Sequence, residues 1–122
     1  MENNEIKEAK LSKIKYKEQE YELVFNLNVM QAIQKRYGTF DTWLELVAPE
    51  EKEADIEAFI FGMCQMINEG IDIQNEDEGS QIPFVSEKQT GRIITDYGLK
   101  EATALLQNTV VEATKDDEPK NA

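Results

Sequence analysis

Apolar and polar residues alternate between Lys13 and Phe25, which predicts two antiparallel strands joined by a tight turn. A two-residue turn at positions 18 and 19 produces four facing pairs: Lys17 with Glu20, Tyr16 with Tyr21, Lys15 with Glu22, and Ile14 with Leu23. Opposite charges then meet on one face and apolar side chains on the other, as a ribbon with one buried face requires. A longer loop would shift this register, because Glu-Gln lacks the Asn or Gly that tight turns prefer.

After the hairpin, apolar residues recur at helical spacing and predict two short helices. A first short helix is predicted from the capping box of Asn28 and Gln31 to a stop at Gly38. Thr39 can cap a second helix, whose apolar face consists of Phe40, Trp43, Leu44 and Val47. Both helices are expected to pack on the hairpin.

The longest apolar stripe predicts a central core helix that begins near Pro49 and ends at Gly70. The acidic residues that follow the proline suit the positive end of a helix dipole. The stripe keeps helical spacing through Ile56, Phe59, Ile60, Met63, Cys64 and Ile67. Phe61 and Met66 lie off this stripe, so a second apolar surface must cover them, either in this chain or in a partner.

The rest of the chain is predicted to hold one long loop and two helices. Residues 71–85 have no period and are expected to form a functional or mobile loop. A capping box of Ser86 and Gln89 begins a helix that ends at Gly98, and a last helix begins near Leu99.

The segments 1–12 and 116–122 are expected to be flexible, the latter as a disordered polar tail. Residues 13–115 then form one α+β domain, mostly helical. Its N-terminal antiparallel β-hairpin packs against four to five helices.

The charge is concentrated in the middle of the chain. The 122 residues carry a formal net charge of −12, and the segment from Asp41 to Glu78 holds twelve acidic residues against one basic residue, Lys52, or −11. Such a surface repels nucleic-acid phosphates and anionic membranes, so neither is an expected partner. The N-terminal sequence has no signal-peptide pattern and no apolar run approaches the length of a membrane span, which predicts a soluble intracellular protein.

Residue types exclude most catalytic chemistry. Histidine is absent and Cys64 is the only cysteine, which rules out His-based acid–base catalysis, intrachain disulfides and Cys/His zinc sites. Cys64 lies on the buried stripe, so a core thiol is a better interpretation than a nucleophile. The acidic segment after Asp72 departs from the calcium-loop pattern at Gln74, Glu76 and Asp77. We therefore predict no catalytic residue, no cofactor and no metal.

Some apolar residues are candidates for a partner surface instead. They are Phe61, Met66, Ile82, Phe84 and Val85. Methionines and an off-stripe aromatic can fill an irregular core, yet Met-rich surfaces also accept varied apolar helices. Both interpretations stay open for Phe61 and Met66.

One stretch carries a recognisable pattern: Tyr21-Glu-Leu-Val-Phe-Asn-Leu-Asn-Val-Met-Gln-Ala-Ile-Gln-Lys-Arg-Tyr-Gly, followed by the aromatic helix from Phe40 to Val47. In this pattern and in the order of its elements, the chain resembles the tail assembly chaperones of long-tailed bacteriophages and prophages of Gram-positive bacteria. Members often have a strand that leads into an Asn-led helix with a Tyr-Gly stop, then an aromatic helix, a long apolar helix and a helical C-terminus. The similarity covers residues 13–115.

The resemblance implies that the chain binds the tape measure protein, keeps it soluble and promotes assembly of the tail tube around it. It implies a place in the bacterial host cytoplasm and absence from the finished virion. It also implies a longer frameshifted product whose extension recruits the tail tube protein. A homo-oligomer is left open.

Two rival hypotheses come from other classes. The first is an acidic DNA mimic that inhibits a nucleic-acid-binding protein, with charges along an elongated face and few spare apolar patches. The second is a small hydrolase or metal-dependent enzyme, for which no constellation of residues is present.

Overall fold

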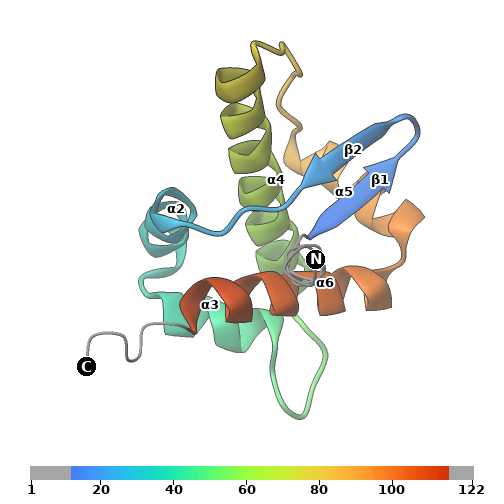
Figure 1. Ribbon diagram of the computed structural model, residues 1–122. Coiled ribbons are helices and arrows are strands. Elements are labelled where there is room, and N and C mark those ends of the chain that lie inside the picture. Colours follow the sequence, from blue (N-terminus) through green and yellow to red (C-terminus); the bar gives the residue numbers. More distant parts are fainter. Residues whose placement is uncertain (1–11, 116–122) are drawn as a thin grey trace, which may run out of the picture.

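The computed structural model describes residues 12–115, which form a two-stranded hairpin followed by five helices (Figure 1). The elements are β1 (Lys13–Tyr16), β2 (Gln19–Glu22), α2 (Leu27–Tyr37), α3 (Phe40–Val47), α4 (Ile56–Glu78), α5 (Glu87–Tyr97) and α6 (Leu99–Thr114). The predicted class, α+β and mostly helical with an N-terminal antiparallel hairpin, is confirmed.

The long helix α4 is the centre of the fold. It packs against α2, α3, α5 and β2, while α6 packs against α5 and β1 also contacts α5 (Figure 1). The core between these elements contains fully buried side chains such as Trp43, Phe59 and Met63. Trp43 lies directly on α4, where its Nε1 donates to the Ala58 carbonyl at 3.0 Å. A side chain at Gly62 would overlap the indole ring, so this glycine allows the close approach of α3.

The hairpin has the predicted faces but a different register. The observed pairs are Lys13 with Glu22, Ile14 with Tyr21, Lys15 with Glu20, and Tyr16 with Gln19. The turn therefore lies at residues 17–18, where Lys17 adopts a φ of 57°. Because the shift is two residues, each side chain keeps its face and lysines still oppose glutamates. The same register extends one pair beyond the strands, where the Leu23 N–H donates a hydrogen bond to the Ser12 carbonyl at 2.7 Å.

The predicted beginning of the first helix is wrong. The N-cap of α2 is Asn26, whose side chain accepts from the backbone N–H groups of Asn28 and Val29. Asn28 lies inside the helix, and its side-chain amide donates a hydrogen bond to the Glu69 carboxylate. The Thr39 cap of α3 is confirmed, since its hydroxyl accepts from Thr42 N at 3.0 Å.

The predicted beginning of the central helix near Pro49 is also wrong. Asp55 is the N-cap of α4 and accepts from Ala58 N at 2.9 Å, so the helix begins at Ile56. Residues 50–54 contain four charged residues and one alanine, so a helix there would have no apolar face to bury. A bond from Asp55 N to Leu46 O at 2.8 Å closes this segment as a loop.

The predicted end of α4 at Gly70 is wrong as well, and so is the long loop over residues 71–85. The helix continues to Glu78 and ends at Gly79, which has a φ of 69°. Gly70 lies inside the helix because the backbone of Glu22 passes there, and a Cβ at this position would overlap the Glu22 carbonyl. Only the segment between Glu78 and Glu87 connects α4 to α5.

The last two helices agree with the sequence pattern. Ser86 and Gln89 form both hydrogen bonds of the capping box, and α6 begins at Leu99 after Gly98. Residues 1–11 and 116–122, expected to be flexible, lie outside the described residues. Ser12 is described and buried, and its hydroxyl accepts a hydrogen bond from Thr109. Over residues 12–115, no helix is long and apolar enough to cross a membrane.

Candidate partner-binding surface

Phe61, a predicted partner-binding residue, is covered by α2. Its side chain is 7% exposed, and the Tyr37 ring packs edge-on against it with centroids 5.7 Å apart. The Arg36 guanidinium lies 4.5 Å from the Phe61 ring centroid. The Arg36 guanidinium donates hydrogen bonds to the carboxylates of Glu87, at 3.1 Å, and Glu57, at 2.9 Å. These two charged hydrogen bonds raise the pKa of Arg36. The second apolar surface that Phe61 requires therefore lies within the chain.

Met66 and Val85 are buried too. Met66 is fully inaccessible, and its carbonyl accepts from Val24 N at 3.2 Å where the chain leaves the hairpin. Val85 is 8% exposed. Three of the five residues predicted for a partner surface, Phe61, Met66 and Val85, therefore belong to the core of this structure. Ile82 is half-buried, and Phe84, at 59%, is exposed.

Two asparagines of α4 hold the segment that contains Phe84. The Asn75 side chain exchanges two hydrogen bonds with the backbone of Ile82, both of 3.0 Å. Asn68 does the same with Val85, at 2.9 and 2.8 Å. The two asparagines are seven residues apart, so they lie on one face of the helix and bind the segment at two points. This arrangement directs Val85 inward and leaves Phe84 on the surface.

An apolar groove at the other end of α4 was not predicted from the sequence. Its large exposed apolar residues are Ile56 and Leu99, each 51% exposed, and the buried Phe59 also lines it. The groove has a volume of about 760 Å³. We call it the α4–α6 groove, and define it by Pro49, Ala54, Ile56, Phe59, Leu99, Thr103, Ala104 and Gln107, together with Lys52, Glu53 and Lys100.

The α4–α6 groove is long enough for two turns of a helix. Leu99, Thr103 and Gln107 recur every four residues, so they lie along one side of α6. At a rise of 1.5 Å per residue, they extend over about 12 Å.

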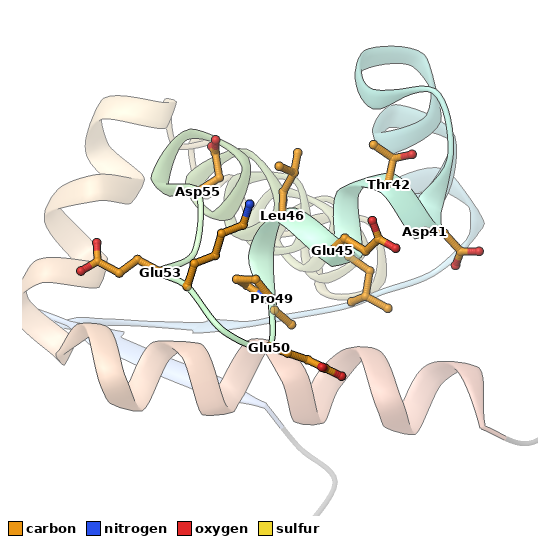
Figure 2. Close-up of a pocket in the computed structure, with 11 residues that line it drawn as sticks. Asp41, Thr42, Glu45, Leu46, Pro49, Glu50, Glu53 and Asp55 are labelled. Atoms are coloured by element: carbon orange, nitrogen blue, oxygen red, sulfur yellow. The ribbon is translucent and has the colours of Figure 1, made fainter.

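A second, acidic cleft adjoins the groove. Figure 2 shows its acidic side chains, which come from α3 and from the loop between α3 and α4. We call this the acidic cleft; its acidic residues are Asp41, Glu45, Glu50, Glu53 and Asp55. The cleft and the groove share Pro49, Lys52 and Glu53, so they lie on the two sides of one loop. An apolar surface and a strongly negative one therefore meet there.

The described part of the chain shows how its acidic side chains and its cysteine are placed. Within residues 12–115, no group of three or more His, Cys, Asp or Glu side chains is placed to hold a metal ion. Cys64 is buried, and this burial raises the pKa of its thiol away from the reactive thiolate form. Its Sγ lies 3.6 Å from the Val85 carbonyl oxygen.

Sequence periodicity missed the groove because Ile56 and Leu99 both belong to apolar stripes. Each is the first residue of its helix. A helical side chain covers the turn that precedes its own Cα, and no such turn exists at a helix start. An apolar residue directly after an N-cap is the signal that could have identified this surface.

Comparisons of the chain with family models, with curated proteins and with solved structures give no match.

Proposed function

We propose that the chain is a tail assembly chaperone of a long-tailed bacteriophage or prophage. It binds the tape measure protein in the host cytoplasm, keeps it soluble and promotes assembly of the tail tube around it. The observation that carries this proposal is the α4–α6 groove, an exposed apolar surface on a chain whose net charge is −12. The order of a hairpin, two short helices, a long helix and helices at the C-terminal end adds support.

The physical basis of the proposed activity is desolvation. A tape measure protein presents long apolar stripes without a core of its own, and contact with a groove removes these stripes from water. The groove covers about two helical turns, so a long helix would bind many copies of the chain. The acidic surface of each copy then keeps the complex dispersed, because like charges oppose association.

Recruitment of the tail tube protein belongs to the same proposal. It would use a longer frameshifted product, and the chaperone would leave before the virion is complete. The acidic DNA mimic remains the alternative, and the acidic cleft is the feature that favours it. A DNA mimic binds its target through charged groups and does not require an exposed apolar groove, so we prefer the chaperone.

Co-expression tests the proposal. A fragment of the tape measure protein encoded nearby should be insoluble alone and should become soluble with this chain, in a complex that persists through size-exclusion chromatography. An unrelated acidic protein of similar size and charge is the control. The proposal fails if the fragment precipitates equally with both proteins.

A further inference from the structure

We infer that the α4–α6 groove binds an amphipathic helix with a basic edge, whose apolar face contacts Ile56 and Leu99 and whose lysines or arginines face the acidic cleft. This inference rests on the proposed function and deepens it. It states where the tape measure protein binds and which of its segments are recognised.

The shape of the groove favours a helix as the occupant. Ile56 and Leu99 lie on the two sides of the groove, on different helices, and both are half-exposed. Apolar residues at positions i, i+3, i+4 and i+7 of a bound helix extend over about 10 Å, which matches the groove. An apolar helix face that inserts between the two residues would bury both.

The charges around the groove determine how a helix with a basic edge is oriented when it binds. The acidic cleft contains five carboxylates and one ammonium group, that of Lys52, which also lines the groove, whereas the α6 side of the groove carries Lys100. A basic edge is therefore attracted toward the loop that contains Glu50 and Glu53 and repelled from Lys100. The edge that faces α6 should be neutral or acidic.

Two synthetic peptides test this chemistry with the full-length protein. Both have about 15 residues and the same apolar face, because shorter peptides form helices poorly. One carries lysines along one edge and the other carries glutamates at the same positions. In fluorescence anisotropy at low salt, the lysine peptide should bind at least about tenfold more tightly, and added salt should reduce this difference.

Matched variants locate the site. Leu27 and Leu99 are both exposed leucines at the first position of a helix, so they can be compared directly. Leu99→Ser and Ile56→Ser should each weaken binding of the lysine peptide about five- to tenfold, as expected for loss of a half-buried aliphatic contact. Leu27→Ser should leave binding unchanged.

A third variant changes charge without changing the core. Glu50 and Glu53 are exposed, so Glu50→Gln with Glu53→Gln should leave the fold intact, as circular dichroism would verify. This double variant should bind the lysine peptide about three- to tenfold more weakly, and its affinity for the glutamate peptide should not fall.

Each failure has a distinct meaning. Equal affinity for the two peptides, no measurable binding of either, or an equal loss from Leu27→Ser would overturn the inference about the groove. If the chain keeps the tape measure fragment soluble but Ile56→Ser with Leu99→Ser keeps it equally soluble, the proposed function stands and the inference falls. If the lysine peptide binds in the groove but the fragment precipitates, the specificity of the groove for a helix with a basic edge stands and the proposed function falls.

Discussion

Replacement of Gly70 by alanine should destabilise the protein strongly, although glycine is unfavourable inside a helix. An alanine Cβ would overlap the Glu22 carbonyl oxygen and lie 3.1 Å from the Glu22 carbonyl carbon. These are backbone atoms, so no side-chain rotation relieves the contact. The hairpin would have to move away from α4, and the bond from Val24 N to Met66 O would weaken.

The magnitude follows from three terms. Overpacking against backbone costs about 3 kcal/mol, the upper end of the usual range. The weakened hydrogen bond costs about 1 kcal/mol. Alanine recovers about 1 kcal/mol of helix propensity. The free energy of unfolding should therefore fall by about 3 kcal/mol, which lowers Tm by about 10 °C in a chain of this size.

Gly91→Ala is the matched control, because Gly91 also lies inside a helix. Its Cβ would meet only Ile60 Cδ1, at 3.7 Å, which is an ordinary contact. This variant should gain about 1 kcal/mol from helix propensity. Urea denaturation followed by circular dichroism gives both free energies. A Gly70→Ala variant that is as stable as Gly91→Ala would refute the close approach of the hairpin to α4.

Three further predictions concern stability. Asn68→Ala should lower the free energy of unfolding in urea by about 2 kcal/mol, because it leaves the Val85 N–H without a partner and the Val85 carbonyl with only the weak Cys64 thiol donor; a loss below about 0.5 kcal/mol would contradict this role. Tyr37→Phe should raise stability by about 1 kcal/mol, since the buried Tyr37 hydroxyl has no hydrogen-bond partner among the described residues. Burial also raises the pKa of Tyr37, so the folded state favours the neutral hydroxyl over the ionised one. The free energy of unfolding is therefore independent of this group below about pH 10 and falls as pH rises from there through the pKa of the folded state. The phenylalanine variant should lose less stability above that pH. Calcium should raise Tm no more than sodium chloride of equal ionic strength, and a larger gain would reveal a site in the acidic cleft.

Sequence periodicity predicted most of the elements because their signals are local. The apolar faces of the hairpin follow from alternation, and the Thr39 cap and the Ser86 capping box were both identified correctly. The helix that contains Gly70 was cut short because glycine is both a common helix stop and a common point of close backbone approach. Only the position of Glu22 in three dimensions distinguishes these two roles.

The candidate site was predicted less well, since burial depends on other elements. Phe61 and Met66 lie off the stripe of their helix, but α2 packs on Phe61 and both side chains are buried. Ile56 and Leu99 lie on the stripes of theirs, yet both are half-exposed. A helical pattern shows which side chains share a face. It does not show where that face ends or what packs against it.

Hydrogen exchange on the complex between this chain and a tape measure fragment tests the central claim most directly. Amide protection should increase over residues 49–59 and 99–107, which contain the α4–α6 groove, and it should stay unchanged around Leu27 and Phe84. Protection confined to the segment of Phe84, or no change in the groove when the complex is formed, would contradict the account.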